Sequence, residues 1–351
     1  MKKSYFRPVI DAMAGYVPGE QPKIDKLIKV NTNENPYPPA PGVFDTLHAF
    51  AANKLRLYPQ PTADIARETI ATLHGVDIDN VIAANGSDDT LNIAIRSFCG
   101  PGLPLACFNP SYSLYPVLAQ MQEAPIIRIN LAEGFRMPSD AAEQAAPANL
   151  LIITRPNAPT GNAFPMAEVR ALIENFDGVV LVDEAYADFS DDNCMDLVRE
   201  YDNLIVSRTM SKSYSLAGIR FGYAVACPEL IEGMMKVKDS YNVDMLTQYI
   251  VRAALSDQEY LDKTRSIILA TRARMEKELA KLGFTYVPSQ TNFLFAAPPD
   301  NDGKRFFDVL RENAILVRYF PGEVTGRYVR ISVGSDAEID KLLEVAARLY
   351  G

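Results

Sequence analysis

The apolar segments of this chain constrain its fold most, because several of them are continuous runs and not alternating patterns. Six short runs are predicted as strands: Val81–Ala84, Leu105–Phe108, Ile126–Ile129, Leu150–Ile153, Val179–Val182 and Leu204–Ser207. Continuous runs are typical of strands that a parallel α/β sheet buries on both faces. Helical segments separate many of them, so the sequence predicts an α/β fold with a doubly wound, mostly parallel sheet.

The pattern changes after residue 228, where the chain becomes mostly helical as far as Leu282. The last third then alternates strand and helix candidates, at Thr291–Ala296, Gly303–Asn313, Ile315–Val317, Tyr328–Val333 and Asp336–Tyr350. We therefore predict a proline-rich N-terminal arm (1–40) that packs with the small domain, a large sheet domain (41–240) and a small α+β domain (241–351).

Charge and composition exclude several classes of protein. The chain has 351 residues with 35 Lys+Arg and 44 Asp+Glu, a formal net charge of −9, and its basic residues form no cluster for nucleic acid. No apolar stretch is long enough to span a membrane. Met1–Lys3 is followed by polar residues, so we expect no signal peptide. Four cysteines without a Cys-x-x-Cys pair indicate buried, reduced thiols in a cytoplasmic protein.

The scarcity of histidine excludes further chemistry. Only His48 and His74 are present, and both are predicted to be structural. His74 precedes Gly75 at a predicted helix end, where a cation suits the helix dipole. Ser-His-Asp, Cys-His and histidine-rich metal sites are therefore disfavoured, and no metal is expected. Chemistry must rest on Lys, Tyr, Asp and Arg, or on a bound cofactor.

Two polar motifs follow predicted strands and suit an anion. Asn85–Asp88 leads into a helix whose first N–H groups could bind phosphate, although a plain capped helix start would look the same. Arg208–Ser213 offers hydroxyls and the Lys212 amine, and Arg220 offers a guanidinium fork. The alternative for this second motif is a basic surface loop.

Two further motifs follow the strands at 150–153 and 179–182. Arg155–Gly161 contains two prolines and a glycine, and it is either a rigid binding loop or an ordinary connection. Asp183 ends an apolar strand, where a carboxylate is costly without a partner. A protonated ring nitrogen or a metal would serve, and a helix cap or a structural salt bridge would serve equally. All four motifs follow the carboxyl ends of predicted strands, and ligands of open α/β sheets bind at those ends.

Together with other segments, these motifs resemble the fold type I pyridoxal-phosphate aminotransferases, in particular the histidinol-phosphate aminotransferase family. The resemblance covers nearly the whole chain in order, at Asn31–Tyr37, Tyr58-Pro59, Asn85–Asp88, Pro110–Tyr112, Pro159–Gly161, Asp183–Tyr186, Ser211-Lys212 and Val329–Gly334. It implies a large domain with a doubly wound, mostly parallel sheet and a small α+β domain. It also implies pyridoxal 5′-phosphate as the cofactor.

The resemblance implies a role for each matching residue. Lys212 would carry the cofactor as a Schiff base and move a proton. Asp183 would pair with the pyridine nitrogen, Tyr186 would donate to the phenolic oxygen, and Tyr112 would stack on the ring. Tyr58 would come from the partner subunit, which implies a homodimer with shared sites. The other cofactor-binding residues would be Gly86, Ser87, Asp88, Thr209, Ser211 and Arg220.

Substrate contacts are implied as well. Arg330 would grip a carboxylate or phosphate, with Arg318 as the second anion contact. Tyr16 and Asn33 in the arm would close over the substrate.

One position departs from the family pattern. Ala158 stands where the family commonly has the Asn that bonds the phenolic oxygen. Either the neighbouring Asn157 reaches that oxygen, or Tyr186 makes the bond alone. We favour the first alternative and predict Asn157 as a cofactor-binding residue.

The implied reaction is amino transfer from histidinol phosphate to 2-oxoglutarate, a step of histidine biosynthesis that yields imidazole acetol phosphate and glutamate. Three alternatives stay open at this point. They are an aromatic amino acid aminotransferase, a pyridoxal-phosphate-dependent threonine-phosphate decarboxylase, and a cofactor-binding regulatory domain without turnover.

Overall fold

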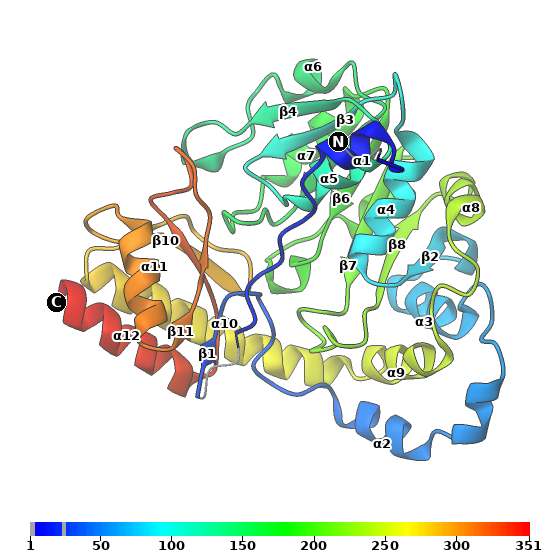
Figure 1. Ribbon diagram of the computed structural model, residues 1–351. Helices are drawn as coiled ribbons and strands as arrows, with labels where there is room; N and C mark the ends of the chain where they lie inside the picture. The colour runs from blue at the N-terminus through cyan, green and yellow to red at the C-terminus, as the bar shows by residue number, and fades with distance from the viewer. Residues whose placement is uncertain (1–3, 23–25) are drawn as a thin grey trace.

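A seven-stranded sheet forms the centre of the larger part of the protein (Figure 1). The computed structural model describes residues 4–22 and 26–351. The strand order is β2-β8-β7-β6-β5-β3-β4, with bounds Val81–Ala84 (β2), Leu105–Asn109 (β3), Ile126–Asn130 (β4), Leu150–Thr154 (β5), Val179–Asp183 (β6), Leu204–Thr209 (β7) and Gly222–Ala226 (β8). All neighbours from β7 to β4 pair in parallel, whereas β8 is antiparallel to both β2 and β7. The six predicted strands and the mostly parallel sheet are confirmed.

Both faces of this sheet are buried, as the continuous apolar runs predicted. Along β6, Val180 and Val182 lie in one apolar core and Leu181 lies in the other. This alternation follows from the two-residue period of side chains along a strand. The helices of this part are Pro41–Ala49 (α2), Asp64–His74 (α3), Ser87–Phe98 (α4), Leu114–Met121 (α5), Ala141–Ala145 (α6), Met166–Glu174 (α7), Pro228–Val237 (α8) and Met245–Leu255 (α9).

Strand β8 was not predicted from the sequence. It reads Gly-Tyr-Ala-Val-Ala, and glycine and alanine have low β propensity, so the local pattern is weak. Tertiary structure supplies the missing stabilisation, because β8 lies between two strands and is buried along its whole length. Gly222 also permits a close approach: a Cβ there would lie 2.4 Å from the amide nitrogen of Ser87, at the start of α4.

The smaller part is built on a four-stranded antiparallel sheet in the order β12-β13-β10-β9. Its helices pack on one apolar core with Phe306, Ile339 and Leu342. The elements are Gln258–Lys281 (α10), Thr285–Tyr286 (β9), Phe293–Ala297 (β10), Gly303–Glu312 (α11), Ile315–Leu316 (β11), Arg318–Tyr319 (β12), Val329–Ser332 (β13) and Asp336–Tyr350 (α12). The capping box of Ser335 and Glu338 fixes the start of α12 at the predicted residue.

The N-terminal arm runs between the two parts (dark blue in Figure 1). It contains a short helix, Pro8–Ala12 (α1), and a short strand, Ile28–Lys29 (β1), which pairs in parallel with β11 of the smaller part. Val30 lies in the core of that part. The segment that follows β1 is therefore tied to the smaller part.

Helix α9 follows the predicted domain limit at residue 240 but packs against the large part. It packs against α2 and α3, and its residues Ile250 and Val251 lie in a core of the seven-stranded sheet. Because the apolar face of α9 belongs to the large part, we propose that the limit lies between α9 and α10, later than residue 240. Helix α10, from residue 258, would then begin the smaller part.

The helices and the potential metal-ligating side chains of the described residues can be compared with the predictions about membrane spans, metals and cysteines. None of the described helices is long and apolar enough to cross a membrane. Among residues 4–22 and 26–351, no three His, Cys, Asp or Glu side chains gather in a way that could hold a metal ion. All four cysteines are buried and unpaired.

Gly222→Ala should destabilise the protein, because the atom nearest to the added Cβ is backbone and cannot rotate away. Overpacking of this kind costs about 1–3 kcal/mol, so the midpoint of urea unfolding should fall. Gly233→Ala in α8 is the matched control, since nothing lies within 4 Å of its Cβ; its midpoint should stay or rise. An unchanged midpoint for Gly222→Ala would contradict the close approach of β8 and α4.

Candidate active site

A cavity of about 450 Å³ lies at the carboxyl ends of the parallel strands. Asp183 ends β6 and Thr209 ends β7, so the sheet forms its floor, and the arm and the smaller part supply the other walls. The predicted site residues that line it are Tyr16, Asn33, Ser87, Asp88, Tyr112, Asp183, Tyr186, Thr209, Ser211, Lys212, Arg220, Arg318 and Arg330. Residues from segments far apart in sequence therefore share one cavity.

The amine of Lys212 is adapted to lose its proton. Its Nζ donates a hydrogen bond to the Thr32 carbonyl oxygen at 2.8 Å. Burial, assisted by the positive charge of Arg330, lowers the pKa of Lys212 to about 8. At pH 7 about one-tenth of an amine with this pKa is neutral, far more than for an ordinary lysine, and the neutral form is the one that attacks an aldehyde or accepts a proton.

The Asp183 carboxylate is buried and held by two hydrogen bonds. Tyr115 donates its hydroxyl to Oδ2 at 2.7 Å, and the backbone N–H of Ala185 donates to Oδ1 at 3.1 Å. Burial raises the pKa of Asp183 to about 6, and both hydrogen bonds oppose that rise. An acid in this position would gain a strong partner in a cationic ring nitrogen.

Tyr115 was missed by the sequence analysis. It is completely buried, and its hydroxyl also contacts Thr154 Oγ1 at 2.6 Å. Its nearness to the predicted Tyr112 was the only signal, and it was weak, because Tyr112 lies before the start of α5 whereas Tyr115 lies in its first turn. The sequence could not indicate that the start of α5 meets the end of β6.

An anion site forms where α4 begins. Gly86 precedes the first turn with φ = 89°, and a Cβ on it would lie 2.8 Å from Arg220 Nη2. The Ser211 hydroxyl lies 3.4 Å from Arg220 Nη1, and Thr209 Oγ1 lies 3.1 Å from Ser211 Oγ. A helix N-terminus, a guanidinium and two hydroxyls together suit a phosphate dianion.

Asp88 joins this anion site to the aromatic wall of the cavity. Its carboxylate accepts from the Tyr112 hydroxyl at 3.1 Å and pairs with Arg220 Nη2 at 3.3 Å. The Tyr112 ring meets the Tyr16 ring edge-on, with centroids 5.8 Å apart. Tyr112 is thus fixed at its hydroxyl and along one edge.

Arg318 and Arg330 lie directly opposite each other on the neighbouring strands β12 and β13. Arg330 Nη2 donates to the Asn31 carbonyl oxygen at 2.9 Å, whereas its buried Nε has no hydrogen-bond partner among the described residues. Arg318 donates to the carbonyl oxygens of Val17 and Pro18 in the arm. Like charges at directly opposed strand positions repel, so this pair favours an anion in the cavity.

Comparison with known proteins identifies the family. The sequence model for the class I and II aminotransferases matches residues 25–345. The chain belongs to this family.

Curated relatives of this aminotransferase include two named histidinol-phosphate aminotransferase. That of Syntrophotalea carbinolica is 46% identical and covers 97% of this chain and 98% of its own length. That of Geobacter sulfurreducens is 44% identical, with 96% and 97% covered. At this identity over nearly full length, the chain belongs to the histidinol-phosphate aminotransferase family, as the motifs predicted.

Solved structures show the same fold. Histidinol-phosphate aminotransferase from Sinorhizobium meliloti, solved with pyridoxal-5′-phosphate, superposes with a TM-score of 0.90 at 24% identity and 99% coverage of both chains. A Thermus thermophilus aspartate aminotransferase variant gives a TM-score of 0.83 at 21% identity, with 98% of this chain and 99% of that chain covered. The predicted fold type I architecture is confirmed.

Three predicted cofactor residues of the aminotransferase lie outside the cavity lining. Gly86 packs against the guanidinium of Arg220. Asn157 donates its amide to the Pro110 carbonyl oxygen at 3.1 Å and to Thr160 Oγ1 at 2.7 Å, whereas Ala158 lines the cavity. Both amide hydrogens of Asn157 are thereby used by other residues of the protein. This geometry disfavours the predicted contact of Asn157 and favours the alternative, in which Tyr186 would bond the phenolic oxygen without Asn157.

Tyr58 is the third residue outside the lining. Its side chain is 81% exposed and stacks on Tyr241 with centroids 4.8 Å apart. Its proposed contact with a neighbouring subunit's cofactor is taken up below.

Asn33 does more than cover the cavity. Its Nδ2 donates to the Tyr186 hydroxyl at 2.9 Å, and its Oδ1 accepts from the Ser332 hydroxyl at 2.9 Å. The arm is thus bonded to both parts of the aminotransferase through one side chain, which fixes the Tyr186 hydroxyl.

The expectation of a cationic His74 is wrong. Burial, assisted by the positive charge of Arg208, lowers the pKa of His74 to about 4, so the ring is neutral near neutral pH. Its Nε2 lies 2.8 Å from the Tyr223 hydroxyl. His74 does end α3 before Gly75, as predicted, but it bonds as a neutral ring.

The Lys212 amine should react with an amine-selective acylating reagent with a midpoint near pH 8. Only the neutral amine attacks, so labelling of cofactor-free protein should accelerate as the pH rises through that value; a simple lysine peptide has a pKa of about 10.4. Mass spectrometry of digests gives the rate at this residue. Arg330→Gln removes a cation that lowers the pKa of Lys212 and should move the midpoint upward. A wild-type midpoint near that of the peptide would contradict the burial argument.

Proposed function

We propose that this aminotransferase transfers the amino group of histidinol phosphate to 2-oxoglutarate with pyridoxal 5′-phosphate as its cofactor, yielding imidazole acetol phosphate and glutamate. The observation that carries the proposal is the Arg318–Arg330 pair, which faces the same cavity as the Lys212 amine. The phosphate of a monoester is close to a dianion near neutral pH, and a dicarboxylate carries two carboxylates, so each substrate offers about two negative charges for two guanidinium groups to bind. The names of the curated relatives support the same substrate.

The residues present fit this cofactor. The start of α4 with Arg220 would hold its phosphate, and the buried Asp183 would face its ring nitrogen. Lys212 supplies the amine that its aldehyde requires, and Tyr112 supplies an aromatic face. Tyr186 would donate to the phenolic oxygen. Bound at this place, pyridoxal phosphate supplies an electron sink for the bonds at the substrate Cα.

The side chains of the protein would transfer the proton, stabilise charge on the cofactor and bind the substrate. The Lys212 Nζ, with its pKa lowered to about 8, accepts a proton from the substrate Cα and would deliver it to C4′ of the cofactor, the carbon of the former aldehyde. Asp183 would lie opposite a positive charge on the ring nitrogen of the bound cofactor, and that charge would keep the carboxylate ionised. Arg330, whose Nε has no hydrogen-bond partner among the described residues, binds the substrate anion, and the arm residues that line the cavity, among them Tyr16 and Asn33, exclude water.

Glutamate should form when the purified enzyme is incubated with the cofactor, histidinol phosphate and 2-oxoglutarate. Lys212→Ala should lower kcat by at least about 10²–10⁴-fold, because it removes the proton-transfer group. Arg330→Gln should raise KM for histidinol phosphate about 10–100-fold through loss of a charged hydrogen bond.

A higher kcat/KM for phenylalanine would favour an aromatic aminotransferase, and carbon dioxide release from threonine phosphate would favour a decarboxylase. Either outcome would overturn the substrate proposal.

We further propose that two copies of the chain share their active sites. Large apolar side chains on α2 and the turns after it are 43–81% exposed, namely Phe44, Leu47, Leu55, Leu57 and Tyr58. Exposed apolar patches of this kind mark interaction surfaces. A Tyr58 hydroxyl that lies outside its own cavity is free to reach the cofactor phosphate of a second copy.

Sharing predicts complementation between two variants. Tyr58→Phe should weaken binding of pyridoxal phosphate, and Lys212→Ala should abolish turnover. When the two are refolded together, one site of each mixed dimer combines an intact Lys212 with an intact Tyr58. Activity at low cofactor concentration should therefore exceed the sum of the separate preparations. Activity equal to that sum, or a monomer in sedimentation analysis, would contradict shared sites.

A further inference from the structure

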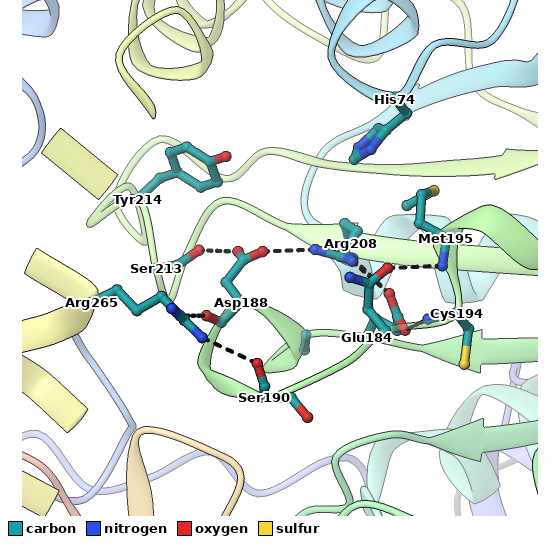
Figure 2. Close-up of polar contacts among 12 residues, drawn as sticks. His74, Glu184, Asp188, Ser190, Cys194, Met195, Arg208, Ser213, Tyr214 and Arg265 are labelled. Atoms are coloured by element: carbon teal, nitrogen blue, oxygen red, sulfur yellow. Dashed lines mark hydrogen bonds and ion pairs between the residues drawn. The ribbon is translucent and has the colours of Figure 1, made fainter. Parts of the chain in front are cut away.

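A buried cluster of charges lies beside the cavity and has no role in the proposed chemistry (Figure 2). Arg208 on β7 sits between two carboxylates, 2.7 Å from Glu184 Oε2 and 2.7 Å from Asp188 Oδ1. Glu184 is 1% exposed and Arg208 is 7% exposed. The other oxygen of Glu184 accepts from the backbone N–H of Cys194. The guanidinium is therefore locked in place by two anions.

The cluster reaches the residue that follows Lys212. The second oxygen of Asp188 accepts a hydrogen bond from the Ser213 hydroxyl, and Figure 2 shows Asp188 between Ser213 and Arg208. On its backbone side, the Ser213 carbonyl oxygen accepts from Asn35 Nδ2 in the arm at 3.0 Å. Ser213, the residue after Lys212, is thus held at its hydroxyl by Asp188 and at its carbonyl oxygen by Asn35 of the arm.

Helix α10 holds the other end of the cluster. Arg265 Nε donates to the Asp188 carbonyl oxygen at 2.5 Å, and its Nη2 donates to the Ser190 carbonyl oxygen at 3.2 Å. Further along the same helix, Ile268 and Met275 lie in the core of the smaller part. The turn that carries Asp188 is therefore fixed by a helix from the part of the protein that also supplies Arg330.

Stability alone does not account for such a cluster. Well-packed apolar residues commonly replace a buried ion pair without loss of stability, because removing charges from water costs about as much as their attraction returns. What apolar residues cannot do is hold a serine hydroxyl in a fixed direction. Here, that hydroxyl belongs to the neighbour of the reactive lysine.

We propose that Asp188 is a positioning residue that fixes Lys212 through Ser213, with Arg208 and Glu184 holding its carboxylate and Arg265 tying it to the smaller part. The inference rests on the proposed role of Lys212. Displacement of a reacting group by about 1 Å can cost about 10²-fold in rate, so a loss of this contact should appear in kcat. Substrate binding depends on Arg330 and Arg318, so KM should change little.

The first experiment compares three serine variants of the holoenzyme. Ser213→Ala should lower kcat at least fivefold, leave KM for histidinol phosphate within about twofold, and change the visible circular dichroism of the bound cofactor, which reports its orientation against Lys212. Ser213→Thr keeps the hydroxyl and should restore most of both signals. Ser190→Ala is the matched control, because its buried hydroxyl has no hydrogen-bond partner among the described residues; it should behave as wild type.

A second comparison addresses the link to α10. Arg265→Gln should lower kcat and alter the dichroism in the same sense as Ser213→Ala, and the double variant should lose little more than the larger single loss. Arg274→Gln is the matched control on the same helix, since Arg274 pairs with Asp336 and Asp340 inside the smaller part. It should leave both signals unchanged. Thermal unfolding of every variant identifies any that are not folded.

The outcomes separate this inference from the proposed function. If wild-type protein yields no lysine adduct after borohydride trapping with pyridoxal phosphate, the role of Lys212 fails. If wild type is trapped at Lys212 and folded Ser213→Ala keeps its kcat and dichroism, only the positioning role of Asp188 fails. Equal effects of Ser213→Ala and Ser190→Ala would also overturn it. If Ser213→Ala does not fold, an Arg265→Gln variant with wild-type kcat and dichroism overturns the link to α10.

Discussion

Parallel pairing of β5, β6 and β7 is the constraint on which the site depends. Because these strands run in one direction, their carboxyl ends meet at one edge of the sheet, and Thr154, Asp183 and Thr209 come to lie there. Continuous apolar runs bury the strands on both faces, so the edge can shift little. The reactive groups follow the strands directly and take their positions from this rigid frame.

Burial then sets the chemistry of the two central ionisable groups, in opposite senses. It lowers the pKa of Lys212 and raises that of Asp183, because exclusion of water disfavours the charged form of each. Both groups are left with values close to physiological pH. A cation facing Asp183 and an aldehyde facing Lys212 would each relieve this cost, and one cofactor carries both.

The smaller part and the arm complete the site from the other side. Arg330 and Arg318 come from two strands of the small sheet, and their carbonyl partners Asn31, Val17 and Pro18 come from the arm. Because β1 pairs with β11, the end of the arm is bonded to the smaller part. The proposed substrate contacts therefore come from both sides of the boundary between the arm and the smaller part, whereas the proposed cofactor contacts belong to the large sheet.

The sequence by itself determined the buried strands, the start of α12 and the motifs at the strand ends, because these depend on the local period of apolar residues and on short-range capping. It also indicated the family, through motifs that occur in order along the chain. Only tertiary structure decided that Tyr115 bonds Asp183, that Arg318 faces Arg330, that Asn157 turns away from the cavity and that His74 is neutral. Strand β8 belongs with these, since its small residues gain stability only between β2 and β7. All of these features have the same physical reason. A contact or a pKa depends on which distant segments pack together, and the local pattern of apolar residues does not contain that information.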